Sequence, residues 1–77
     1  MNHEFTINVQ EVEELQTIGN TEALEQMFVK ARRMVVGGGA VVLVRKSPGG
    51  EMSRFDELTN ENDLSQYQQQ VFKYLSR

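Results

Sequence analysis

The sequence predicts a single small α+β domain over residues 1–77, with three helices packed on a small antiparallel sheet of two or three strands. Three observations lead to this fold class. Residues 40–44, Ala-Val-Val-Leu-Val, form an uninterrupted apolar run, which is typical of a strand buried on both faces. The segments on either side have helical periodicity. Ser-Pro-Gly-Gly at 47–50 predicts a tight reversal, and therefore a β-hairpin over about residues 40–56. The predicted order is β-α-α-β-β-α.

The first element is a short strand over about residues 4–8, where apolar and polar residues alternate. The apolar spacing then changes from two to three, which predicts a short amphipathic helix with Asn8 as its N-cap and Gly19 at its C-terminus. An alternative is that the strand continues through Val9 and the helix has only two turns. The apolar positions of this helix are Val9, Val12, Leu15 and Ile18.

The second helix has the clearest pattern in the chain. Asn20 is in the position of an N-cap, and three glycines at 37–39 end the helix. The apolar residues between them recur every three or four positions and form one continuous stripe, which is expected to pack on the sheet. They are Leu24, Met27, Phe28, Ala31 and Val35.

The strand that returns from the reversal begins near Glu51, and its register is not fixed by the sequence. Met52 and Phe55 are three residues apart and fall on opposite faces of a regular strand, so a β-bulge or an early end is expected. Thr59 or Asn60 then starts the last helix. Its apolar stripe is Leu64, Tyr67, Val71, Phe72 and Leu75.

Composition narrows the classes of protein. The chain has no cysteine and one histidine, His3, so disulfides are excluded and neither a metal site nor a cofactor is expected. No apolar run approaches the roughly 20 residues that a membrane span needs, so no membrane association is expected. The first residues lack the basic and apolar segments of a signal peptide, and a cytoplasmic location is therefore expected.

No catalytic activity is expected. The serines have no nucleophile motif around them, and the adjacent carboxylates Asp56-Glu57 and Glu13-Glu14 are more typical of a solvated surface than of an acid–base pair. The three glycines follow a helix and precede a strand, which is the reverse of the order that presents a helix N-terminus to phosphate. The glycines are therefore expected to be a flexible connection between the helix and the strand and not a phosphate site.

The charges are unevenly distributed. Residues 1–29 carry six glutamates and no Lys or Arg, whereas residues 30–54 have a net charge of +5. Such a chain pairs its own halves, pairs with a second copy, or uses the basic segment 30–54 to bind nucleic acid as an accessory protein. In the last case the contacts would come from Lys30, Arg32, Arg33, Arg45, Lys46 and Arg54.

The leading hypothesis is a small protein-interaction or regulatory module that forms a homodimer. A chain of 77 residues without disulfide or metal has a limited core, and three helices cover one face of a sheet more easily than two. A second copy would cover the other face or pair with the edge of the returning strand. The candidate interface residues are Val41, Leu43, Ser53 and Tyr74.

Overall fold

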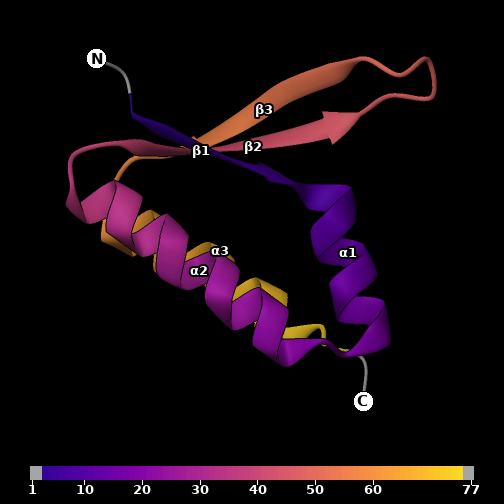
Figure 1. Cartoon of the computed structure of the whole chain (residues 1–77), viewed down its shortest axis with the longest axis horizontal. Helices are drawn as coiled ribbons and strands as arrows, with labels where there is room; N and C mark the ends of the chain where they lie inside the picture. Colours follow the sequence, from indigo (N-terminus) through magenta and orange to yellow (C-terminus); the bar gives the residue numbers. More distant parts are fainter. Residues whose placement is uncertain (1–2, 76–77) are drawn as a thin grey trace.

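A computed structural model describes residues 3–75. Within this range the chain forms three helices and three strands in the predicted order β-α-α-β-β-α, so the α+β fold class is confirmed. Figure 1 shows the sheet as one layer, with the paired helices α2 and α3 lying along one side of it. The elements are β1 (Glu4–Asn8), α1 (Val9–Ile18), α2 (Thr21–Val36), β2 (Ala40–Lys46), β3 (Met52–Leu58) and α3 (Glu61–Lys73).

The sheet is mixed, which corrects the prediction of an antiparallel sheet. Its strand order is β1-β2-β3, with β1 parallel to β2 and β3 antiparallel to β2. Parallel strands need a long crossover, and α1 and α2 between β1 and β2 supply it. The apolar run at 40–44 therefore becomes the central strand, flanked on both sides, as its continuous hydrophobicity requires.

Asparagines begin all three helices, as predicted for Asn8 and Asn20 and as one of two choices for Asn60. The Asn8 side chain accepts a hydrogen bond from the backbone N–H of Gln10 at 3.0 Å. Asn20 and Asn60 each accept from the N–H three residues on, at 3.1 and 2.8 Å. Each cap satisfies a backbone donor that the first helical turn leaves free.

The hairpin contains the predicted bulge. Leu43 pairs with Asp56 and Val44 with Arg54, so Phe55 is the extra residue on β3 and its side chain is 54% exposed. The bulge reconciles the spacing of Met52 and Phe55 with the pleat of the strand. At the turn, Gly50 has a φ of 92°, which closes a short loop between Ser47 and Glu51.

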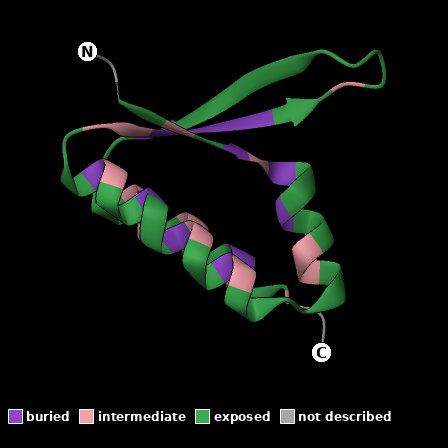
Figure 2. Ribbon diagram, viewed as in Figure 1, coloured by how far each residue is buried: buried purple, intermediate pink, exposed green. Residues whose placement is uncertain are grey.

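The core lies between the helix layer and one face of the sheet. Leu24, Phe28, Ala31 and Val35 of α2 are all buried and belong to one hydrophobic cluster with residues from the other elements. Figure 2 shows buried positions recurring along α2 on the side that packs inward. The ring of Phe28 lies 5.8 Å from that of Tyr67 and 5.9 Å from that of Phe72, which ties α2 to α3.

The opposite face of β2 is covered within the single chain. Val42 and Val44 lie outside the main cluster but are only 1% and 5% exposed. Arg54 of β3 and Glu4 of β1 form an ion pair at 3.3 Å. Because β2 lies between these two strands, this pair spans it on the face that carries Val42 and Val44. A second copy is therefore not needed to bury this face.

The glycine segment has a packing role at its last position. A Cβ on Gly39 would lie 2.5 Å from the backbone oxygen of His3 and 2.5 Å from the sulfur of Met34. This close approach allows the N–H of Ala40 to donate to His3 O at 3.0 Å, where β2 begins to pair with the N-terminal segment. Gly38 has a φ of 92° and supplies the left-handed conformation that redirects the chain.

Candidate functional site

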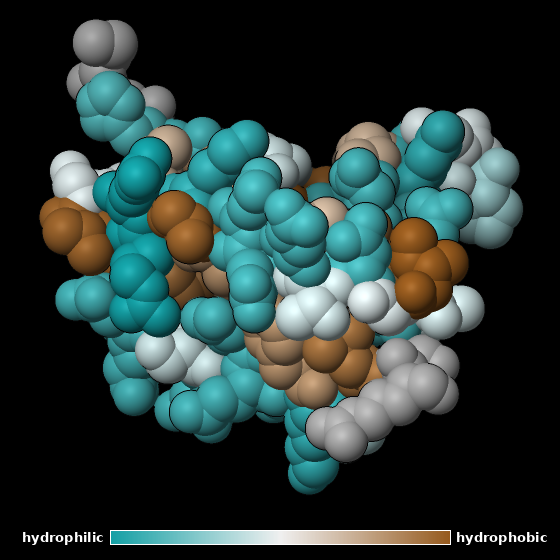
Figure 3. Space-filling model, turned by 60° about the horizontal axis from the view of Figure 1, so that its bottom comes forward, coloured by the Kyte–Doolittle hydropathy of each residue, from teal (hydrophilic) through white to brown (hydrophobic). Residues whose placement is uncertain are grey.

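A groove with a volume of about 800 Å³ runs along α2 where it meets α3. Phe28 contributes to its wall, and Val29 and Val36 are 51% and 65% exposed there. Exposed aliphatic side chains grouped at a groove are typical of a surface that another molecule covers. Figure 3 shows hydrophobic side chains interrupting the largely hydrophilic surface in the view turned from that of Figure 1.

Val29 and Val36 reach this groove because they lie outside the buried stripe of α2. The core takes positions 24, 28, 31 and 35, and each of the two valines follows a buried residue by one position. Successive residues are rotated by about 100° on a helix, so these side chains point away from the core. Neither valine was predicted from the sequence to be a site residue. Both could have been selected from the sequence, because they are aliphatic residues that lie outside the apolar stripe expected to form the buried face of the helix.

Charged groups border the groove. Arg32 donates to Glu61 Oε1 at 3.4 Å and to Gln68 Oε1 at 3.3 Å, and these contacts hold its side chain against α3. The Arg32–Glu61 pair is about half exposed on both sides, so it orients Arg32 more than it stabilises the fold. Glu25 and Arg33 also line the groove, and neither takes part in the ion pairs found among residues 3–75.

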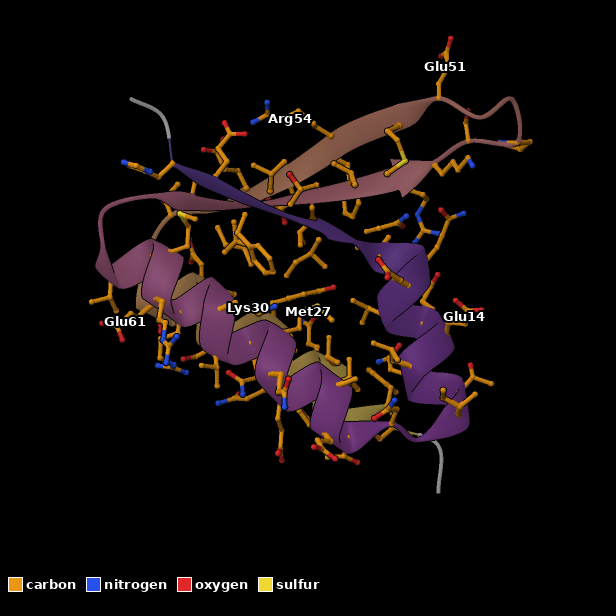
Figure 4. The ribbon with its side chains drawn as sticks, viewed as in Figure 1. Glu14, Met27, Lys30, Glu51, Arg54 and Glu61 are labelled. Carbon is orange, nitrogen blue, oxygen red and sulfur yellow. The ribbon has the colours of Figure 1, made fainter. Side chains whose placement is uncertain are left out.

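The six basic residues singled out in the sequence do not share one face. Figure 4 shows Arg54 on the side of the sheet opposite the helices, whereas Lys30 lies on α2. Arg45 pairs with Glu13 of α1 at 3.5 Å, and Arg54 and Arg32 have the acidic partners described above. The acidic N-terminal third and the basic middle of the chain thus partly neutralise each other. Because Arg54 lies across the sheet from the basic residues of α2, the six residues do not form one contact surface for a nucleic-acid backbone.

The four candidate interface residues are also dispersed. Val41 and Leu43 are 0% and 3% exposed and belong to the core under the chain's own helices, so they are not accessible to a partner. Ser53 is exposed on β3. Tyr74 is 68% exposed after the end of α3, with the Nζ of Lys73 at 5.6 Å from its ring centre. These positions form no single surface.

A polar hollow of about 280 Å³ lies between β3 and α3 and is bordered by Asp56, Glu57, Asp63 and Tyr67. Burial, helped by the charge of nearby Glu13 and opposed by Arg45, raises the pKa of Tyr67 to about 12. The phenol is therefore neutral at ordinary pH and unsuited to act as a base. Among the described residues, no group of three or more His, Asp or Glu side chains is arranged to hold a metal ion.

A further groove of about 360 Å³ lies beside β1, bordered by Phe5, Leu15, Met27 and Lys30 among others. Phe5, Leu15 and Met27 are half-buried and pack on the core, so this groove exposes less apolar side chain than the α2 groove.

No helix in residues 3–75 is long and apolar enough to cross a membrane. Comparisons of the chain with family models, curated proteins and solved structures found no match.

Proposed function

We propose that this chain is a small, non-catalytic protein-interaction module that binds its partner through the groove along α2. The observation that carries the proposal is the placement of Val29 and Val36, two exposed aliphatic side chains at the groove of about 800 Å³ along α2. Helices with an exposed apolar edge beside a groove are a recurring mode of recognition between proteins. A regulatory role is proposed with it, and a homodimeric state is proposed separately from the binding surface.

The location of the polar groups supports this assignment. Arg32, held by Glu61 and Gln68, gives the groove a fixed charged border, while Val29 and Val36 supply apolar contact area. An apolar centre with a charged rim is the usual arrangement of a protein interface.

A cytoplasmic location is also proposed, in keeping with a cysteine-free composition, and fractionation of the source cells tests it.

Site-specific photo-crosslinking tests the binding surface. A benzophenone amino acid is introduced at Val29, and separately at Phe55, which is exposed to a similar extent (51% and 54%) but lies on β3. Adducts are expected in the source cells from position 29 and not from position 55. If position 29 gives no adduct, or if both positions give the same adducts, the α2 groove is not the binding surface.

A further inference from the structure

The exposed ridge of α2 carries opposite charges at equal spacing on either side of one valine. Glu25 lies four residues before Val29, and Arg33 lies four residues after it. With a rise of 1.5 Å per residue, each charge lies about 6 Å from Val29 along the helix axis. All three residues line the groove. Figure 4 shows α2 in full, with its outer side chains directed away from the sheet.

These two charges have no partner inside the described chain. The three ion pairs among residues 3–75 use Arg32, Arg45 and Arg54 as their cations, and none includes Glu25 or Arg33. The two side chains cannot pair with each other, because eight residues separate them by about 12 Å along the helix. Charges at one or two turns from an apolar centre commonly set the orientation of a partner helix.

We propose that the occupant of the groove is a second copy of this chain, with the two α2 helices packed antiparallel about a two-fold axis at Val29. This inference rests on the proposed function of the groove. The axis brings Glu25 opposite Arg33 of the partner subunit, and symmetry repeats the pair on the other side. Val29 then meets Val29 of the partner subunit between the two ion pairs, which is an isologous contact.

The charge pattern selects this occupant and this orientation. A parallel arrangement would place Glu25 opposite Glu25 of the partner subunit and Arg33 opposite Arg33 of the partner subunit, which is repulsive at both positions. A peptide of a single charge sign would be attracted at one end of the ridge and repelled at the other. A second copy in the antiparallel orientation satisfies both ends. The contact is small, so the dimer is expected to dissociate on dilution.

Charge reversal tests the pairing. Glu25→Arg leaves the two subunits with arginine facing arginine at both ends, and Arg33→Glu does the same with glutamate. Each exchange turns two exposed attractive pairs into repulsive ones, so each variant should dimerise roughly tenfold to thirtyfold more weakly than the unmodified chain. The measurement is sedimentation equilibrium over about 5–500 μM, a range in which mass action resolves a weak dimer.

The two single variants are then mixed in equal amounts. In a mixed pair every arginine of one chain faces a glutamate of the other, so a heterodimer with affinity near that of the unmodified chain is expected. The double variant with both exchanges should also recover, because its two pairs re-form with reversed sign. Circular dichroism checks that all variants fold, and restoration on mixing is itself incompatible with simple unfolding.

The outcomes separate the inference from the proposal it rests on. Weakening by each single exchange and recovery on mixing would support the antiparallel dimer. An unmodified chain that stays monomeric to about 500 μM would overturn it, as would single variants that dimerise normally. If the chain is monomeric but position 29 still crosslinks to another protein in cells, the dimer is refuted while the interaction module stands. If position 29 gives no adduct of any mass, both fail.

Discussion

Replacing Phe28 by alanine should lower the free energy of unfolding by about 3–5 kcal/mol, the range for a buried phenylalanine. Phe28 is 2% exposed, and its ring contacts Tyr67 and Phe72 at centroid distances of 5.8 and 5.9 Å. Both distances fall where aromatic pairs add roughly 0.5–1.5 kcal/mol beyond the burial of area, which places the loss toward the upper end.

This loss is large relative to the whole domain. A 77-residue chain is expected to have a total stability of about 4–12 kcal/mol, so the variant should be close to unfolding at room temperature. Urea unfolding monitored by circular dichroism measures the change, with an osmolyte added to both proteins if the variant is partly unfolded in water. Dilute protein keeps any dissociation of a dimer from contributing to the difference.

Phe55→Ala provides a matched control. The chemical change is identical, but Phe55 is 54% exposed in the bulge of β3 and should cost below about 1 kcal/mol. The contrast between the two variants tests the position of α2 against the sheet directly. If both substitutions cost the same small amount, the side of α2 that carries Phe28 does not face the core, and the packing described here is wrong.

Three further outcomes are expected. Because folding raises the pKa of Tyr67 to about 12, the neutral phenol contributes to the free energy of unfolding; this contribution is complete below about pH 10 and is lost toward pH 12. The urea midpoint should therefore fall less between pH 9 and 11 in Tyr67→Phe than in the unmodified chain. Gly39→Ala should cost about 2 kcal/mol by thermal unfolding, more than the roughly 1 kcal/mol expected for Gly38→Ala, because only the former meets atoms at 2.5 Å. Asn60→Ala should cost about 1 kcal/mol and speed amide exchange in the first turn of α3; unchanged exchange there would contradict its role as a cap.

Elements governed by local chemistry could be predicted from the sequence. An asparagine N-cap needs only a helical segment after it, so Asn8 and Asn20 could be assigned without tertiary information. The phase of Met52 and Phe55 on one strand predicted a bulge or an early end, and the strand has the bulge. In each case the residues that decide the structure lie within a few positions of one another, and few competing conformations satisfy them.

The direction of β1 could not be predicted in this way. Alternation of Phe5 and Ile7 with polar residues fits a strand in either direction, because one buried face is all that it specifies. The parallel pairing depends on how α1 and α2 carry the chain from Asn8 to Ala40. That path is set by packing of both helices on the core, which is not a property of any short segment.

The cover of the second sheet face was missed for a related reason. A second copy was the expected cover for the face that the helices leave free, but Val42 and Val44 on that face are only 1% and 5% exposed in the single chain, and an ion pair between the two outer strands spans it. Glu4 and Arg54 are fifty residues apart in the sequence and come together only through the strand order β1-β2-β3. Long charged side chains with apolar stems can replace a second hydrophobic layer on a small sheet.

The same pairing explains why the dimer contact that we propose lies on α2 rather than on the sheet. The acidic N-terminal strand and helix pair with the basic hairpin through Glu4 and Glu13, so the charge asymmetry of the sequence is partly resolved inside the chain. Glu25 and Arg33 are left out of this pairing because both project from the exposed side of one helix, at opposite ends of the ridge centred on Val29. Glu25 and Arg33 are too far apart to pair within one helix, but each can pair with the opposite charge on a second, antiparallel copy of α2. The charges on this ridge therefore favour antiparallel association of two copies.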